Sequence, residues 1–161
     1  MRAGRCYHRP MAVTKARKRA ASKVEPKQST HSASVLTPAD SALVTRLREI
    51  CLALPEANER ISHGEPTWFA GKGKVFAMLD NHHHGSEHLG VWLPQPRGVQ
   101  EHWLAAEPKQ FFRPPYVGSR GWVGLVLDTR PDWKLVAQLV RESYQFVATS
   151  KLRALLASRV P

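Results

Sequence analysis

The sequence contains few cysteines and no long apolar run. Its two cysteines, Cys6 and Cys51, are too few for the disulfide framework that stabilises small secreted domains. No stretch approaches the roughly 20 continuous apolar residues of a transmembrane helix, and the first residues lack the apolar segment of a secretory signal. We therefore expect a soluble protein in a reducing compartment, the cytoplasm, with no membrane partner.

Acidic residues are scarce at the start of the chain, and this decides how the net charge of +11 is interpreted. Residues 1–36 contain nine Lys or Arg and one acid, Glu25, and so carry +8. Residues 37–161 contain fifteen basic and twelve acidic residues and carry only +3. Because excess positive charge favours a polyanionic partner, most of any affinity for nucleic acid is expected in residues 1–36.

Large apolar residues are also rare in residues 1–36, which are rich in Lys, Arg, Ala and Ser. Such a segment cannot bury enough apolar surface to offset the entropy lost on ordering. We therefore predict a disordered basic tail over residues 1–36 and a single folded domain over residues 37–161. An Arg-rich, acid-poor segment is also typical of organellar transit peptides, so a targeting role is the alternative for the tail.

Amphipathic helices are predicted at both ends of the domain. Thr37 suits the N-cap of the first helix, with Pro38 at its first position and Asp40 placed to complete a capping box. Its apolar residues recur at three- and four-residue steps until Pro55. The last long helix is expected from about Pro131 to Thr149, docked on a sheet along its length. Its apolar arc consists of Trp133, Val136, Leu139, Val140, Tyr144 and Val147.

Short β-prone segments lie between these helices, after a polar link. Thr67–Ala70 and Lys74–Leu79 flank Gly71-Lys72-Gly73 and predict a hairpin. Further strands are predicted over Leu89–Leu93 and Trp122–Leu127, and short helices over Val99–Ala106 and Lys151–Ala157. This order predicts an α+β fold, an antiparallel sheet with the N- and C-terminal helices packed on one face.

Several motifs, taken in this order, resemble the MmcQ/YjbR family. They are His63–Trp68, Lys74–Leu79, Arg113–Gly118 with Gly121–Val123, and Asp132-Trp133 and Ser143-Tyr144 in the last long helix. The resemblance covers about Thr37 to Ala157 and implies a fold similar to the frataxin-like two-layer sandwich. It also implies DNA binding, the function by which the family is described, although a fold does not by itself establish a function. The basic tail has no counterpart in the family pattern.

Nucleic-acid contacts are predicted for basic residues that can reach phosphates. They are Lys15, Arg17, Lys18, Arg19 and Lys23 in the tail, and Lys72, Lys74, Arg113 and Arg120 in the domain. Arg113 and Arg120 belong to a loop made rigid by proline and glycine, which suits a binding site. The structural alternative for Arg113 is a hydrogen bond to neighbouring backbone carbonyls.

These residues lead to two functional hypotheses. The first is a non-enzymatic binding module that contacts DNA or RNA mainly through phosphates. The second is a protein- or small-ligand-binding domain with a pocket near the Arg113–Gly121 loop. A continuous positive face would favour the first, and a cleft beside this loop would favour the second.

A histidine-rich turn is the one candidate metal site. Neutral imidazoles at His82, His83, His84 and His88 could bind a divalent metal. Consecutive side chains in a turn point in different directions and no cysteine is near, so a solvated turn is expected, with no metal and no cofactor.

His63 and Glu65, with Asp80 near them across the hairpin, could carry out acid–base chemistry. No nucleophile, phosphate-binding loop or zinc motif accompanies them, so we expect no enzymatic activity and no catalytic residue. The five tryptophans lie within apolar patterns. They are expected mainly in the core, with base stacking reserved for an exposed exception.

Overall fold

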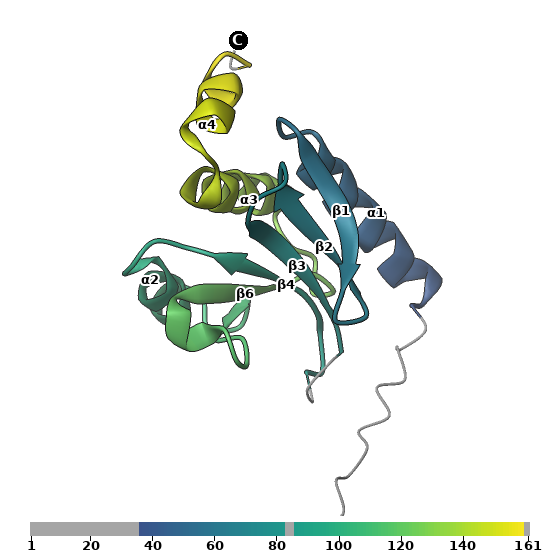
Figure 1. The fold of residues 1–161 in the computed structure, drawn as a ribbon. Coiled ribbons are helices and arrows are strands. Elements are labelled where there is room, and N and C mark those ends of the chain that lie inside the picture. The colour runs from purple at the N-terminus through teal and green to yellow at the C-terminus, as the bar shows by residue number, and fades with distance from the viewer. Residues whose placement is uncertain (1–35, 83–85, 160–161) are drawn as a thin grey trace, which may run out of the picture. The chain divides into compact units, whose positions relative to one another are not determined.

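The structure, a computed structural model, describes residues 36–82 and 86–159, all within one compact unit. Its elements follow the order α1 (Pro38–Leu52), β1 (Ala57–Ser62), β2 (Glu65–Ala70), β3 (Val75–Asn81), β4 (Leu89–Pro94), α2 (Val99–Ala106), β5 (Phe111–Phe112), the 3-10 helix η2 (Gly118–Arg120), β6 (Trp122–Val126), α3 (Trp133–Val147) and α4 (Ser150–Ala157). The strands form one antiparallel sheet in the order β1-β2-β3-β4-β6-β5 (Figure 1). None of the helices in these two ranges is long and apolar enough to span a membrane.

The start of α1 agrees with the sequence. The Thr37 hydroxyl accepts a hydrogen bond from the backbone N–H of Asp40 at 3.1 Å, and the Asp40 carboxylate accepts one from the backbone N–H of Thr37 at 3.3 Å. The predicted capping box is therefore confirmed. The buried residues of α1, which belong to the core, are Val44, Leu47 and Cys51.

Helix α3 lies against the sheet and against α1, and in Figure 1 both helices lie behind the strands. Its buried residues include Val136, Leu139 and Val140. The Ser143 hydroxyl donates to the carbonyl of Phe76 in β3 at 2.5 Å, and the Tyr144 hydroxyl donates to the carbonyl of Pro55 at 2.6 Å. The predicted α+β sandwich, with N- and C-terminal helices on one face of an antiparallel sheet, is confirmed.

Strand β1 occupies the segment that the sequence predicts to be a polar link, so that prediction is wrong. His63 and Gly64 have φ angles of +55° and +87° and form the two-residue turn of a tight hairpin. Ser62 then pairs with Glu65, and β1 pairs with β2 along its whole length. Because β1 is at the edge of the sheet, its polar composition is tolerated there. The two-residue strand β5 was also not predicted.

The ring of Phe112 in β5 packs over glycines in two other strands. A Cβ atom at Gly124 of β6 would lie 2.4–2.6 Å from carbon atoms of this ring, and one at Gly90 of β4 would lie 3.3 Å from it. Only glycine leaves room for the ring at Gly124. Because Gly90 and Gly124 have no side chains, the ring of Phe112 lies directly on the sheet there.

Candidate functional site

The predicted nucleic-acid contacts of the folded domain do not form one patch. Lys72 and Lys74 are exposed in the turn between β2 and β3, whereas Arg113 follows β5 and Arg120 ends η2, both also exposed. Strands β4 and β6 lie between β3 and β5, so these two strands separate the lysines from Arg113, and β4 lies between β3 and the strand that follows Arg120. The tail residues of the prediction, Lys15, Arg17, Lys18, Arg19 and Lys23, lie outside the described residues.

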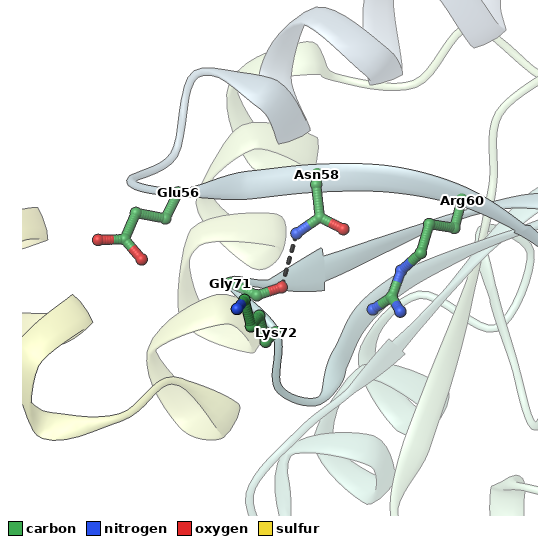
Figure 2. A pocket seen from close by; sticks show the side chains of 5 residues that line it. All are labelled: Glu56, Asn58, Arg60, Gly71 and Lys72. Atoms are coloured by element: carbon green, nitrogen blue, oxygen red, sulfur yellow. Dashed lines mark hydrogen bonds between the residues drawn. The ribbon is translucent and has the colours of Figure 1, made fainter.

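A groove of about 570 Å³ lies beside Lys72, between strand β1 and the β2–β3 turn (Figure 2). Asn58 spans it by donating from its side-chain nitrogen to the carbonyl of Gly71 at 2.6 Å. Arg60 stacks its guanidinium on Phe69, 3.5 Å from the ring centroid. Glu56 at the other end pairs with Lys151 at 3.5 Å. The groove therefore offers two cations to a phosphate, Arg60 and Lys72, but a carboxylate lies in the same lining.

A second cavity, of about 510 Å³, lies beside the Arg113–Gly121 loop. It is lined by Asp80, Ser86, Glu87, His88, Pro108, Lys109, Phe111, Phe112, Arg113, Pro115 and Val126. The aliphatic part of Arg113 packs on Gly118, where an added Cβ would meet its Cγ at 2.4 Å. The structural alternative for Arg113 was a hydrogen bond to neighbouring backbone carbonyls. Within residues 36–82 and 86–159 its guanidinium makes no such bond.

Two buried carboxylates, Glu65 of β2 and Asp80 of β3, lie opposite each other, and Asp80 also lines this cavity. Thr67 pairs with Met78, and the same antiparallel register carried two residues further sets Glu65 opposite Asp80. Glu65 is 5% exposed and Asp80 is 2% exposed. The Asp80 carboxylate accepts a hydrogen bond from the indole N–H of Trp92 at 3.1 Å. Burial, and then the negative charge of Asp80, raise the pKa of Glu65 to about 7. The expected proximity of Glu65 and Asp80 is observed.

The raised pKa of Glu65 predicts that stability depends on pH. From about pH 5 to pH 7 the folded state holds a proton on Glu65 that the unfolded state has released, so the free energy of unfolding falls as the pH rises. Glu65→Gln removes this titration. It should flatten the fall and make the variant more stable than the natural chain at about pH 8, by on the order of 1 to 3 kcal/mol.

Urea unfolding of both chains from about pH 5 to pH 8 measures this effect. Glu49→Gln, at an exposed position of α1, is the matched control and should retain the pH dependence of the natural chain. If Glu65→Gln gives the same pH curve as the natural chain, Glu65 is not the group that titrates.

The remaining candidates are histidines and tryptophans. His63 is exposed, with its Nδ1 3.0 Å from the Ser62 hydroxyl. His88 contacts Asp128 at 3.1 Å, while His83 and His84 lie outside the described residues. In the part of the chain that is described, no group of three or more His, Cys, Asp or Glu could hold a metal. Of the tryptophans, Trp68 and Trp92 are buried and the other three are half-buried, as expected for core residues.

The chain was compared with known protein families and with solved structures. Residues 52–146, from the end of α1 to near the end of α3, match the model of the YjbR family. This chain belongs to the YjbR family. The resemblance found in the sequence is therefore confirmed, and the matched residues include the whole sheet and both cavities of this YjbR domain.

The YjbR domain also resembles a solved structure, the crystal structure of Deinococcus radiodurans protein DR2400, described with the domain DUF419. The TM-score is 0.57 and the sequence identity 23%, over 71% of this chain and 87% of that chain. At this identity the likeness concerns the fold alone. No curated protein matches the chain.

Proposed function

We propose that this YjbR-family protein is a non-enzymatic binding module that contacts nucleic acid, DNA first, mainly through the phosphates. The observation that carries the proposal is the charge of residues 1–36, which hold +8 of the net +11. Lys and Arg at this density neutralise phosphates and release counterions without reading bases. The description of the family as DNA-binding supports the same proposal.

The arrangement of the folded domain supports a tail-centred form of this proposal. A helix that reads the major groove needs a basic exposed face. The exposed side of α3 instead combines Lys134 with Gln138 and Gln145, and the half-buried Arg141 with Glu142. The exposed cations near β3 and β5 are separated by two strands. Phosphate contacts by the domain are therefore proposed as a minor addition to those of the tail.

Cys51 and Ser143 support the non-enzymatic part of the proposal. Burial raises the pKa of the Cys51 thiol well above its ordinary value, and a protonated buried thiol is a poor nucleophile. The buried Ser143 hydroxyl donates to the Phe76 carbonyl. Cys51 is also unpaired, which suits the reducing cytoplasm that we propose as the location.

The test compares the full chain with residues 37–161 on duplex and single-stranded DNA and RNA, using unrelated sequences at several salt concentrations. The full chain should bind and lose affinity steeply as salt rises, whereas residues 37–161 should bind poorly with a shallow salt dependence. Equal affinity and equal salt dependence would move the binding surface to the folded domain. Absence of binding by both chains at physiological salt would refute the proposal.

A second function, binding of a small ligand, is favoured by the cavity beside the Arg113–Gly121 loop. Its volume of about 510 Å³ lies within the range of small-molecule sites, and its lining combines aromatic walls with a few charged groups. The loop that the sequence singled out forms part of that lining through Arg113 and Pro115.

A further inference from the structure

The loop between β5 and β6 carries an exposed tyrosine. Tyr116 is 75% exposed, the largest exposed fraction of any bulky apolar side chain in residues 36–82 and 86–159. Single exposed apolar residues are common on protein surfaces. What distinguishes Tyr116 is the conformation, the anchoring and the charge of the loop around it.

The backbone holds Tyr116 in a conformation that is uncommon for a tyrosine. Its φ angle is +62°, in the left-handed region that favours glycine. The backbone N–H of Val117 donates to the carbonyl of Pro115 at 2.7 Å, which closes a three-residue γ-turn around Tyr116. Strained backbone of this kind persists only where the surrounding structure imposes it, and it clusters at ligand-binding sites.

The rest of the loop is anchored to the domain. The backbone N–H of Gly118 donates to the carbonyl of Pro114 at 3.0 Å, and the buried Gln100 side chain of α2 donates to the Gly118 carbonyl at 2.8 Å. Arg113 lies across the same glycine, because an added Cβ at Gly118 would meet its Cγ at 2.4 Å. A ligand that binds an already ordered loop pays less conformational entropy than one that must order it.

The loop and its flanks carry only positive charge. Residues 108–121 contain three cations and no acid, and the cations Lys109, Arg113 and Arg120 are all exposed. Glu87 shares the lining of the neighbouring cavity with Lys109 and Arg113, so one exposed carboxylate stands against three cations. An exposed aromatic ring among cations is complementary to a strand with unpaired bases, whose phosphates meet the cations and whose bases stack on the ring.

We propose that this loop binds a single-stranded segment of nucleic acid, with Tyr116 stacked on an unpaired base and Arg113 and Arg120 at its phosphates. The inference rests on the nucleic-acid binding proposed above and gives that function a substrate class. The tail supplies most of the affinity through charge, and the loop adds a preference for unpaired bases. Every base has a face on which a tyrosine ring can stack, so no sequence is preferred. In a duplex these faces are covered by the neighbouring base pairs.

The first experiment measures, by fluorescence anisotropy at one salt concentration, the affinity of the full chain for an oligothymidine strand and for an abasic strand with the same number of phosphates. Oligothymidine should bind about fivefold or more tightly than the abasic strand. Equal affinities would mean that only charge is recognised, which would overturn this inference and leave the charge-driven function standing. Absence of binding to both strands and to duplex DNA at physiological salt would overturn both.

Variants of the full chain assign the preference to Tyr116. Tyr116→Ala should lower the affinity for oligothymidine about fivefold or more, while the affinities for the abasic strand and for duplex DNA stay unchanged. Tyr116→Trp should retain the affinity of the natural chain, because it keeps an aromatic face. Phe146→Ala, the matched control, removes a 52% exposed ring from α3 and should change no affinity. Melting curves establish that each variant is folded. A folded Tyr116→Ala chain that binds oligothymidine like the natural chain would overturn the assignment.

Two further measurements test the phosphate contacts and the class of partner. Changing both Arg113 and Arg120 to Ala should lower the salt slope on oligothymidine by about 1 to 1.5, at about 0.7 per phosphate of a single strand. An unchanged slope would overturn the phosphate contacts of the loop. Oligouridine should displace oligothymidine from the full chain, and the tighter of the two assigns RNA or DNA. Equal displacement by polyglutamate of the same charge would assign an acidic protein segment as the partner and overturn the inference.

Discussion

Val140→Asp should abolish folding. Val140 is 0% exposed on the side of α3 that packs against the sheet, so the new carboxylate would be buried without a partner. An unpaired buried charge costs several kcal/mol, which is a large share of the about 5 to 15 kcal/mol that stabilises a domain. The variant should lose the cooperative thermal transition followed by circular dichroism and should accumulate in the insoluble fraction.

Gln145→Asp is the matched control for this experiment, because it places the same side chain on the exposed side of α3. Its free energy of unfolding should change by no more than about 1 kcal/mol. A Val140→Asp chain that melts like the natural one would contradict the packing of α3 on the sheet.

The full chain with Lys15, Arg17, Lys18, Arg19 and Lys23 all changed to Ala should lose most of its affinity for duplex DNA. Each neutralised phosphate contributes about 0.9 to the slope of log affinity against log salt, so five lost contacts should lower that slope by about 4 to 5. At about 0.1 M salt the affinity should fall by more than about 100-fold. Fluorescence anisotropy at four or more salt concentrations measures both quantities.

The matched control changes Lys72, Lys74, Arg113 and Arg120 to Ala and so removes nearly as much charge from the folded domain. Its salt slope should stay close to that of the natural chain, because these cations lie in two separate groups. If this variant loses affinity and the tail variant does not, phosphate contacts belong to the domain. The tail would then be better explained by its alternative, a targeting role.

The elements predicted well are those fixed by short-range signals. The capping box of α1 depends on Thr37 and Asp40, three residues apart, and α3 follows from the spacing of its apolar residues. Strand β1 has no continuous apolar face, because Glu59 lies between Ala57 and Ile61. Glu59 accepts hydrogen bonds from Arg48 at 2.7 Å and from Trp68 at 3.0 Å. A charged residue therefore stands at a position where the alternation of a half-buried strand predicts an apolar residue. The signal that could have found β1 is His63-Gly64, a two-residue turn.

The candidate site was predictable only in part. The Arg113–Gly121 loop stands out by its prolines and glycines, and the register of one hairpin brings Glu65 to Asp80. The rest of the cavity joins β3, β4, β6 and β5, and β5 precedes β6 in the chain but lies outside it in the sheet. Spacing along the sequence carries no information about such an order. Gly90 and Gly124, within strand patterns, were the one local sign that another group packs against them.

The position of α3 after every strand has a consequence for how the domain forms during protein synthesis. The ribosome adds about 5 to 20 residues per second, so the six strands are made before α3, whose Tyr144 packs against Phe76 of β3. In that interval α1 alone can cover the apolar face of the sheet. A nascent chain at this stage exposes both that face and the sheet edges, and it therefore depends on chaperones more than the finished domain does.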